Sequence, residues 1–225
     1  MKPNYYSQST AVGATSVLRQ AFAWMFAGLA VTGVAALAAA SSVAFEQMLI
    51  ATPMLLMGLF IVEIGLVWFV SARISTLSHP VAIALFLAYA LLNGITLSFL
   101  LLIYTSESVA ASFFAASAMF GVMAGYGYVT NKDLSSVGRI AFMGLIGLII
   151  AMVINFFLHS DAMSYVISLI GIIIFTALTA YDTQRIKAMS QTMGGENLGI
   201  YGALRLYLDF INLFIFILRL MGRRR

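Results

Sequence analysis

Cysteine is absent from these 225 residues, so the chain holds no disulfide, no thiolate metal site and no cysteine nucleophile. Histidine occurs only as His79 and His159, both at the edges of predicted loops, so we expect no histidine-based metal centre or catalytic triad. Charge is also scarce: Asp, Glu, Lys and Arg make up 9% of the chain, whereas soluble domains carry about 25%. Such a chain does not cover a globular surface with polar groups, so a lipid bilayer must solvate most of it.

Long apolar runs take the place of the missing charge. Hydrophobic residues make up 62% of the chain, and the mean hydropathy is +1.02. Each run has close to the roughly 20 residues that a helix needs to cross a bilayer, and backbone groups in lipid must bond within their own helix. We therefore predict an all-α integral membrane protein, a single domain over residues 1–225 with seven transmembrane helices. The predicted spans cover about residues 22–43, 48–71, 81–104, 109–129, 140–158, 163–181 and 199–220.

Short polar segments separate these spans. Glu46 and Gln47 are predicted to divide the first two, and Pro80 stands where it begins the third helix. The longest predicted connection runs from Thr183 to Leu198 and contains the Gly194-Gly195 pair. No connection is long enough for a second domain.

Basic residues gather at alternate ends of the spans. Because cytoplasmic loops carry the excess of Lys and Arg, this alternation places the N-terminus and the even-numbered loops in the cytoplasm. Such scattered residues fit membrane topology and lipid headgroups, and we predict no nucleic-acid partner. The residues concerned are Lys2, Arg19, Arg73, Lys132, Arg139, Arg185, Lys187 and Arg205.

The last span does not follow the charge pattern. Only 13 residues separate Arg205 from Arg219, and Arg223–Arg225 follow at the end. Two interpretations remain open. Either the helix crosses fully and its arginines reach the interface along their aliphatic stems, or it is a buried or re-entrant helix with a cytoplasmic C-terminus.

A few ionisable residues fall inside or at the ends of the predicted spans. Glu63 lies in the middle of the second, Asp209 lies in the seventh, and Asp182 ends the sixth on the cytoplasmic side, as Arg73 ends the second. Charge at membrane depth is costly, so these groups should face the bundle interior or water. Two carboxylates in a low dielectric share a proton and titrate as a unit, and an adjacent arginine favours the ionised form. Such a cluster is a candidate pH-dependent latch, and carboxylates along an aqueous path suit Ca²⁺.

Purely structural roles compete with this interpretation. Asp182 can pair with Arg185 on its own helix, and Asp209 with Arg205 four residues earlier. Glu63 can be a protonated hydrogen-bonding group. The intramembrane asparagines are expected to form hydrogen bonds between helices rather than to bind a ligand. They are Asn93, Asn155 and Asn212.

Two segments carry a resemblance to a known family. The sequence Tyr-Asp-Thr-Gln-Arg-Ile at 181–186 ends the sixth span, and Leu-Arg-Leu-Tyr-Leu-Asp-Phe-Ile-Asn-Leu-Phe at 204–214 fills the seventh. Together they closely resemble the signature of the Bax-inhibitor-one (lifeguard, TMBIM) family, and the seven-span layout matches from about Val17 onward. The short N-terminal tail is similar to that of the bacterial branch.

The resemblance implies a fold and a site. It implies a bundle in which six helices wrap a central seventh, and a pH-sensitive calcium leak across the membrane. The family's two pH-sensing aspartates match Asp182 and Asp209, which would also contact the permeating Ca²⁺. The family's latch arginine matches Arg73 best, and Glu63 falls where the family often has an intramembrane glutamate, here a candidate pore acid.

We therefore expect a multi-pass protein of the bacterial inner membrane that conducts calcium, is not an enzyme and needs no cofactor. Its expected partners are membrane lipids and calcium ions. The alternative is a regulatory protein that modulates a membrane-bound AAA protease or the machinery of stress and cell death. A proton-coupled transporter is a third hypothesis, because intramembrane acids also form proton relays. An intramembrane hydrolase is disfavoured, because the Gly-Asp motif of such proteases is absent.

Overall fold

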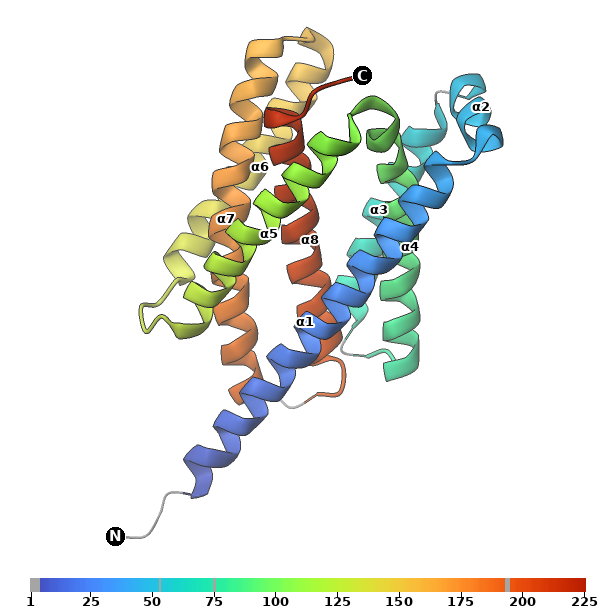
Figure 1. Cartoon of the computed structure of the whole chain (residues 1–225). Helices are drawn as coiled ribbons and strands as arrows, with labels where there is room; N and C mark the ends of the chain where they lie inside the picture. The colour runs from blue at the N-terminus through green and yellow to red at the C-terminus, as the bar shows by residue number, and fades with distance from the viewer. Residues whose placement is uncertain (1–4, 53, 75, 193–194) are drawn as a thin grey trace.

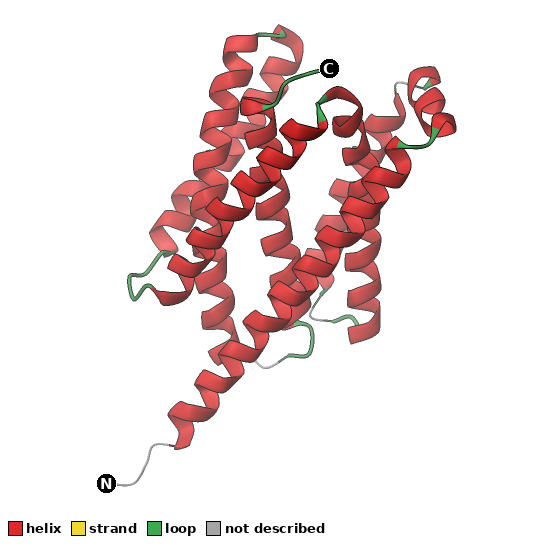
Figure 2. Cartoon of the chain, viewed as in Figure 1, coloured by secondary structure: helices red, strands yellow, loops and turns green. Residues whose placement is uncertain are grey.

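The structure is a computed structural model that describes residues 5–52, 54–74, 76–192 and 195–225. Across these residues the chain folds into helices, without strands, as Figure 2 shows. Figure 1 labels them α1 to α8. Their bounds are Tyr5–Ala40, Val43–Ala51, Met54–Arg73, His79–Ile103, Ser106–Val129, Ser135–Leu158, Asp161–Thr192 and Leu198–Met221.

Local sequence signals set several helix ends. The Ser42 hydroxyl accepts from the backbone N–H of Phe45 at the start of α2, and Thr105 accepts from Ser108 in the same way at the start of α5. A proline in the first turn begins α4, as predicted from Pro80. At the end of α6, His159 has a φ of 53°, the left-handed conformation that stops a helix.

The predicted boundary between the first two spans was wrong. Glu46 and Gln47 lie inside the short helix α2 rather than in a connection. The chain breaks earlier, at Ser41 and Ser42, because Ser42 caps a new helix there. The predicted second span is therefore divided between α2 and α3.

Helix α7 is longer than its apolar run. It was predicted to end near Tyr181, but it continues to Thr192 and so shortens the predicted loop before α8. Polar residues continue a helix as well as apolar ones do when one face stays packed. Ile186, which is 1% exposed, supplies that contact. Gly194 of the predicted loop lies outside the described residues.

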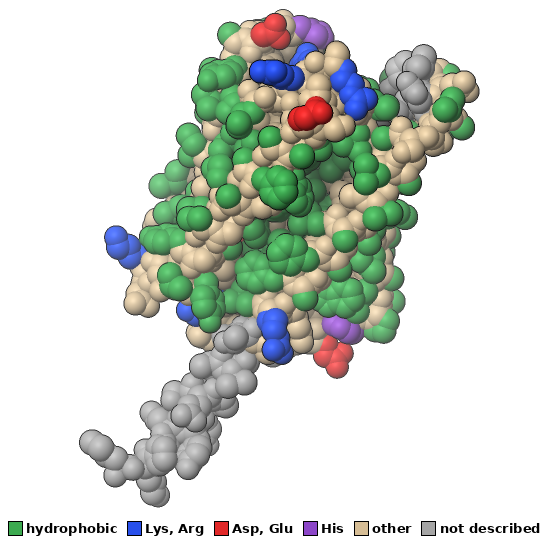
Figure 3. Space-filling view, in the orientation of Figure 1, with side chains coloured by type: hydrophobic (Ala, Val, Ile, Leu, Met, Phe, Trp, Pro, Cys, Tyr) green, Lys and Arg blue, Asp and Glu red, His purple; other side chains and the backbone are tan. Residues whose placement is uncertain are grey.

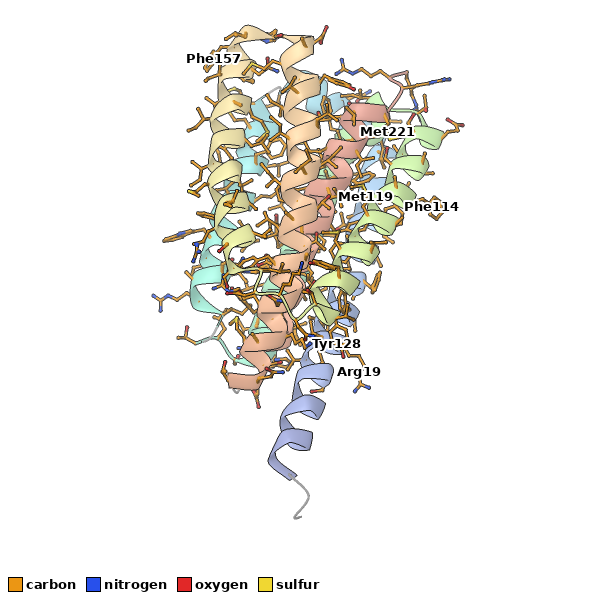
Figure 4. All side chains as sticks on the ribbon, turned by 90° about the vertical axis from the view of Figure 1, so that its left-hand side faces the viewer. Arg19, Phe114, Met119, Tyr128, Phe157 and Met221 are labelled. Atoms are coloured by element: carbon orange, nitrogen blue, oxygen red, sulfur yellow. The ribbon has the colours of Figure 1, made fainter. Side chains whose placement is uncertain are left out.

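Five helices are long and apolar enough to cross a membrane, and all five were predicted. They are α4, α5, α6 and α7 over their whole lengths, together with Ser16–Ala40 of α1. The remaining predicted spans, α3 and α8, do not belong to this group, so the count of seven remains a prediction. The surface agrees with a bilayer: in Figure 3, hydrophobic side chains form a belt and charged side chains lie at the two ends. Phe114 and Phe157 project outward from it in Figure 4 and are 72% and 73% exposed. The chain is a multi-pass membrane protein.

Helix α8 carries the largest share of buried residues. It packs against α1, α5 and α7, and more lightly against α4. Its Tyr207 ring is fully buried, with edge-to-face contacts to Phe86 and Tyr89 on α4 at centroid distances of 5.8 and 5.9 Å. Because lipid tails are as apolar as a core side chain, close packing and hydrogen bonds must hold α8 in place.

The C-terminus lies at the opposite end of the bundle from the start of α1 (Figure 1). The residues after α8 pair with the α4–α5 connection: Thr105 N–H donates to the Arg223 carbonyl over 3.1 Å, and Arg225 N–H donates to the Ile103 carbonyl over 2.8 Å. Helix α8 is continuous from Leu198 to Met221. Of the two interpretations that the sequence left open, the full crossing of α8 stays a prediction, because α8 is not among the five helices of membrane length and composition.

Candidate functional site

The site is formed where the C-terminal half of α7 faces the first half of α8. On α7, Leu178, Asp182 and Ile186 recur every four residues and are all buried, which places Asp182 in the middle of an otherwise apolar face. On α8, Arg205 and Asp209 have the same spacing and share one side of the helix. The two faces meet because α7 and α8 pack along each other.

An ion pair joins the two helices. Arg205 Nη1 donates to both carboxylate oxygens of Asp182, over 3.1 Å to Oδ1 and 3.2 Å to Oδ2. The Arg205 side chain is 36% exposed and that of Asp182 is 5% exposed, so the carboxylate is the buried partner. Arg205 Nε donates to the Tyr201 hydroxyl over 2.8 Å, which fixes the guanidinium. This is the one ion pair between side chains of the described part of the chain.

Asp209 lies beside this pair without a direct bond to it. Its side chain is buried, and its Oδ2 accepts no hydrogen bond from the described residues. The charges of Asp182 and Arg205 both act on it electrostatically. Asp182 thus acts electrostatically on Asp209, and the role predicted for the two acids stays a prediction, whereas no hydrogen bond or ion pair joins Asp209 to Arg205. The Arg205 guanidinium acts electrostatically on both carboxyl groups, but it forms hydrogen bonds only with Asp182.

Close helix contacts hold the acids in position. At Gly127 on α5, a side chain would collide with the Ala180 carbonyl on α7, two residues before Asp182. At Gly202 on α8, an added Cβ would lie 2.9 Å from the Ala21 Cβ on α1. Small residues allow such close approach between membrane helices. Helices α5 and α7 are therefore in close backbone contact near Asp182, and α8 lies close against α1.

Arg73 is not part of this cluster, and its predicted contact with Asp182 is absent. It ends α3, its side chain is exposed, and Asp182 is bound by Arg205 instead. The physical reason is helix packing: α3 packs against α4, whereas α8 lies directly against α7. The sequence named Arg205 only as a partner for Asp209 on its own helix. Its position within the 204–214 signature was the available signal for a role in the site.

Glu63 belongs to a separate polar cluster on the other side of α8. Its side chain is 5% exposed, and its Oε2 accepts from Asn93 Nδ2 over 3.4 Å. The Tyr207 hydroxyl donates to Asn93 Oδ1 over 3.1 Å and lies 2.6 Å from Thr32 Oγ1. This cluster joins α1, α3, α4 and α8. It confirms that Asn93 bonds between helices, and composition alone did not identify Tyr207 or Thr32.

The other two asparagines differ from each other. Asn155 Nδ2 donates to Ser164 Oγ over 2.7 Å, which joins α6 to α7 as expected. Asn212 instead donates to the Leu208 carbonyl of its own helix over 2.8 Å, so the interhelical bond predicted for it is not formed. A side-chain donor that bonds to a carbonyl in the preceding turn of its own helix is satisfied without an acceptor on a neighbouring helix.

The cluster offers few ligands for a tightly held metal ion. Within the described residues, no group of three or more Asp, Glu, His or Cys side chains is placed to hold one. Ca²⁺ takes six to eight oxygen ligands.

Comparison with known proteins covers almost the whole chain. The sequence profile of the family described as inhibitor of apoptosis-promoting Bax1 matches residues 14–225. The chain is 43% identical to the inner membrane protein YbhL of Escherichia coli strain K12 over 219 residues, which cover 95% of this chain and 94% of YbhL. An uncharacterised protein of Rickettsia prowazekii is 41% identical over 217 residues, covering 95% of this chain and 92% of its own length. An uncharacterised membrane protein of Streptococcus pyogenes serotype M3 is 42% identical over 180 residues, covering 79% and 78%.

Proposed function

The chain belongs to the family of the inhibitor of apoptosis-promoting Bax1, and from this membership we propose that it is a pH-sensitive calcium leak channel of the bacterial inner membrane. The observation that carries the proposal is the buried cluster of Asp182, Arg205 and Asp209 between α7 and α8. Calcium is the permeating ion in this proposal, not a cofactor. No covalent chemistry is involved, so the proposal assigns no enzymatic activity.

The charge balance of the cluster supports a proton-operated gate. One guanidinium neutralises one carboxylate, and a second ionised carboxylate beside them would lack a counter-charge in a low dielectric. Asp209 Oδ2, buried without a hydrogen-bond donor, is where a proton relieves that cost. The two acids therefore titrate together, and the proton content of the pair depends on pH.

The gate acts through the Arg205–Asp182 bond. At neutral or alkaline pH, ionised Asp182 holds Arg205 and fixes α8 against α7 at the cytoplasmic end. As the pH falls, the acids take up protons, the neutral Asp182 binds the guanidinium less strongly, and the contact between the helices loosens. Ca²⁺ then moves down its gradient toward the cytoplasm. The proposal transfers the latch from Arg73 to Arg205, because Arg205 is the arginine in contact with Asp182.

The proposal also includes the wider architecture. We propose that α3 and α8 cross the bilayer with the five helices of membrane length and composition, and that α8 is the central helix of this seven-span bundle. The burial of α8 along its length and its packing against α1, α5 and α7 support this arrangement. An ion path beside α8 would then connect the acid cluster with the outer end.

The test is calcium flux into proteoliposomes between about pH 6 and 8, the range in which a buried, coupled carboxyl pair can change its protonation. The full-length chain should admit calcium faster at pH 6 than at pH 8. Asp209→Asn should abolish this difference, and Asp133→Asn, in the exposed α5–α6 loop, serves as the matched control. A flux that is independent of pH, or unchanged in Asp209→Asn, refutes the gate.

A second candidate function is regulation of a cytoplasmic-side partner such as a membrane-bound AAA protease. The observation that favours it is a recess of about 540 Å³ between the α5–α6 loop and α7, lined by Lys132, Asp133 and Arg185 among others. Gln184 fixes its wall, since its side chain accepts from Leu134 N–H over 2.9 Å and donates to the Lys132 carbonyl over 2.8 Å. Co-purification of a protease, lost in Lys132→Glu, without intrinsic calcium flux would favour this function.

A further inference from the structure

An apolar recess opens between α1 and α5 at membrane depth, with α8 as its floor. Its volume is about 230 Å³, and α4 closes its far side. Figure 3 shows the hollow between these helices, and in Figure 1 α1 and α5 slant across the view in the same direction with α8 behind them. The walls are almost entirely aliphatic and aromatic. They include Leu29, Leu97, Phe113, Phe210, Ile211 and Phe214.

A second recess of about 470 Å³ continues the first toward the outer end of the bundle. The two share Leu37, Leu101, Val109 and Phe113, so they form one continuous groove, here named the α1–α5 groove. The outer part changes in chemistry. It adds Ser41, Tyr104, Ser106 and Arg225, so the groove is apolar within and carries hydroxyl groups and a guanidinium at its rim.

The rim arginine is held in place by its backbone. Arg225 N–H donates to the Ile103 carbonyl, Arg223 N–H donates to Ser108 Oγ over 2.9 Å, and Arg225 Nη2 lies 3.5 Å from Ser106 Oγ. No carboxylate side chain of the described residues pairs with Arg225, although Glu107 lies in the adjacent first turn of α5. The guanidinium thus points to the groove mouth with its charge uncompensated by a neighbouring side chain.

We infer that the α1–α5 groove binds one anionic phospholipid, with an acyl chain in the apolar recess and the phosphate at Arg225 and Ser106. The aliphatic and aromatic lining at membrane depth suits a hydrocarbon chain. Guanidinium groups bind phosphate through paired N–H donors, and a hydroxyl adds a further bond. The lipid comes from the leaflet at the C-terminal end of the bundle, opposite the acid cluster. This inference concerns a different site from the proposed gate and does not depend on it.

Substitution of a glycine in the groove wall would fill the apolar recess. Gly33 lines its wall on α1, and a Cβ added there would meet no atom within 4 Å, so a larger side chain enters the groove rather than the protein. Gly121 on α5 is also open within 4 Å but does not line the groove, which makes Gly121→Phe the matched control for Gly33→Phe. At the rim, Arg225→Gln removes the charge, and Arg224→Gln is the control because Arg224 lines a different recess.

The experiment is native mass spectrometry of the delipidated full-length protein, titrated with phosphatidylglycerol or with phosphatidylcholine of the same acyl chains. The unchanged chain should retain one phosphatidylglycerol about tenfold more tightly than phosphatidylcholine, a difference equivalent to about 1.4 kcal/mol. Arg225→Gln should remove this preference but keep the bound lipid. Gly33→Phe should lose the bound lipid of either headgroup, and both control variants should behave as the unchanged chain does.

Several outcomes overturn the inference. The first is an equal affinity of the unchanged chain for the two lipids. The second is a lipid that stays bound in Gly33→Phe. The third is displacement of phosphatidylglycerol by millimolar inorganic phosphate, which would show that the site binds a simple anion. Gly33→Leu fills the recess with a smaller side chain, so the test stands if Gly33→Phe fails to fold. An unaltered gel-filtration profile in detergent defines a folded variant.

Discussion

Arg205 on α8 donates from its Nη1 to both carboxylate oxygens of Asp182 on α7, at 3.1 and 3.2 Å. This contact is an ion pair that joins α8 to α7. Asp209 lies one turn after Arg205 on α8, and within the described part of the chain its Oδ2 accepts no hydrogen bond. The cluster therefore contains a buried pair that holds two helices together and a neighbouring acid whose protonation changes the charge balance of that pair.

Arg205→Gln should destabilise the protein, because it leaves Asp182 buried without its counter-charge. Removing one partner of a fully buried ion pair costs about 3–5 kcal/mol, and we expect about 2 kcal/mol here because Arg205 is partly exposed. The thermal midpoint in detergent should fall at pH 8. At pH 6 the loss should be smaller, because a protonated Asp182 needs no counter-charge.

Arg73→Gln is the matched control, since it removes the same charge from an exposed helix end. We expect its thermal midpoint and the pH dependence of its calcium flux to equal those of the unchanged chain. A larger effect for Arg73→Gln than for Arg205→Gln would show that Arg73 is the latch.

Asp209→Asn should leave calcium flux insensitive to pH, because an amide does not titrate: the two side chains no longer take up protons as a unit, and Asp182 keeps its bond to Arg205. We expect equal flux at pH 6 and pH 8, measured in proteoliposomes with an entrapped calcium dye.

Asp133 is the comparison acid for that measurement. Hydrogen bonds from Ser135 lower the pKa of its carboxyl, so it is ionised throughout pH 6 to 8 and contributes no proton. Asp133→Asn should keep the pH dependence of the unchanged chain. If it removes that dependence instead, the sensor lies in the loop.

Gly127→Ala should destabilise the protein, whereas Gly125→Ala should not. A Cβ at Gly127 collides with the Ala180 backbone, so α5 must move away from α7, and overpacking of this kind costs about 1–3 kcal/mol. A Cβ at Gly125 meets no atom within 4 Å, and alanine favours the helix by up to about 1 kcal/mol. Thermal unfolding of the two variants in the same detergent gives the comparison. Equal midpoints would show that α5 and α7 are not in close contact.

Tyr207→Phe should weaken the polar cluster at Glu63 only modestly. It removes the hydroxyl between Asn93 and Thr32, and interhelical hydrogen bonds in membranes contribute about 0.6 kcal/mol each. Asn93→Leu should cost more, because the buried Glu63 Oε2 loses its donor. Unfolding midpoints of both variants check the order, and the reverse order would mean that Glu63 does not depend on Asn93.

Composition and hydrophobic length were enough for the helical membrane architecture, since a chain with 9% charge has no other solvent than lipid. They also located most of the helices. They failed at Glu46 and Gln47, because Ser42 caps a new helix that continues through both residues. They failed again at the end of α7, because the helix extends past its apolar run where Ile186 packs against the bundle. Hydropathy measures transfer into lipid, not where a helix stops.

The sequence by itself also predicted that Asp182 and Asp209 lie at similar depths on two consecutive helices, since residue spacing along a helix fixes depth. Only the tertiary structure decided which arginine binds Asp182. Arg73 and Arg205 lie at similar predicted depths, and periodicity gives no information about which helices are neighbours. That choice depends on the packing of α8 against α7, where small residues and matched surfaces bring Arg205 within 3.1 Å and leave Arg73 at the exposed end of α3.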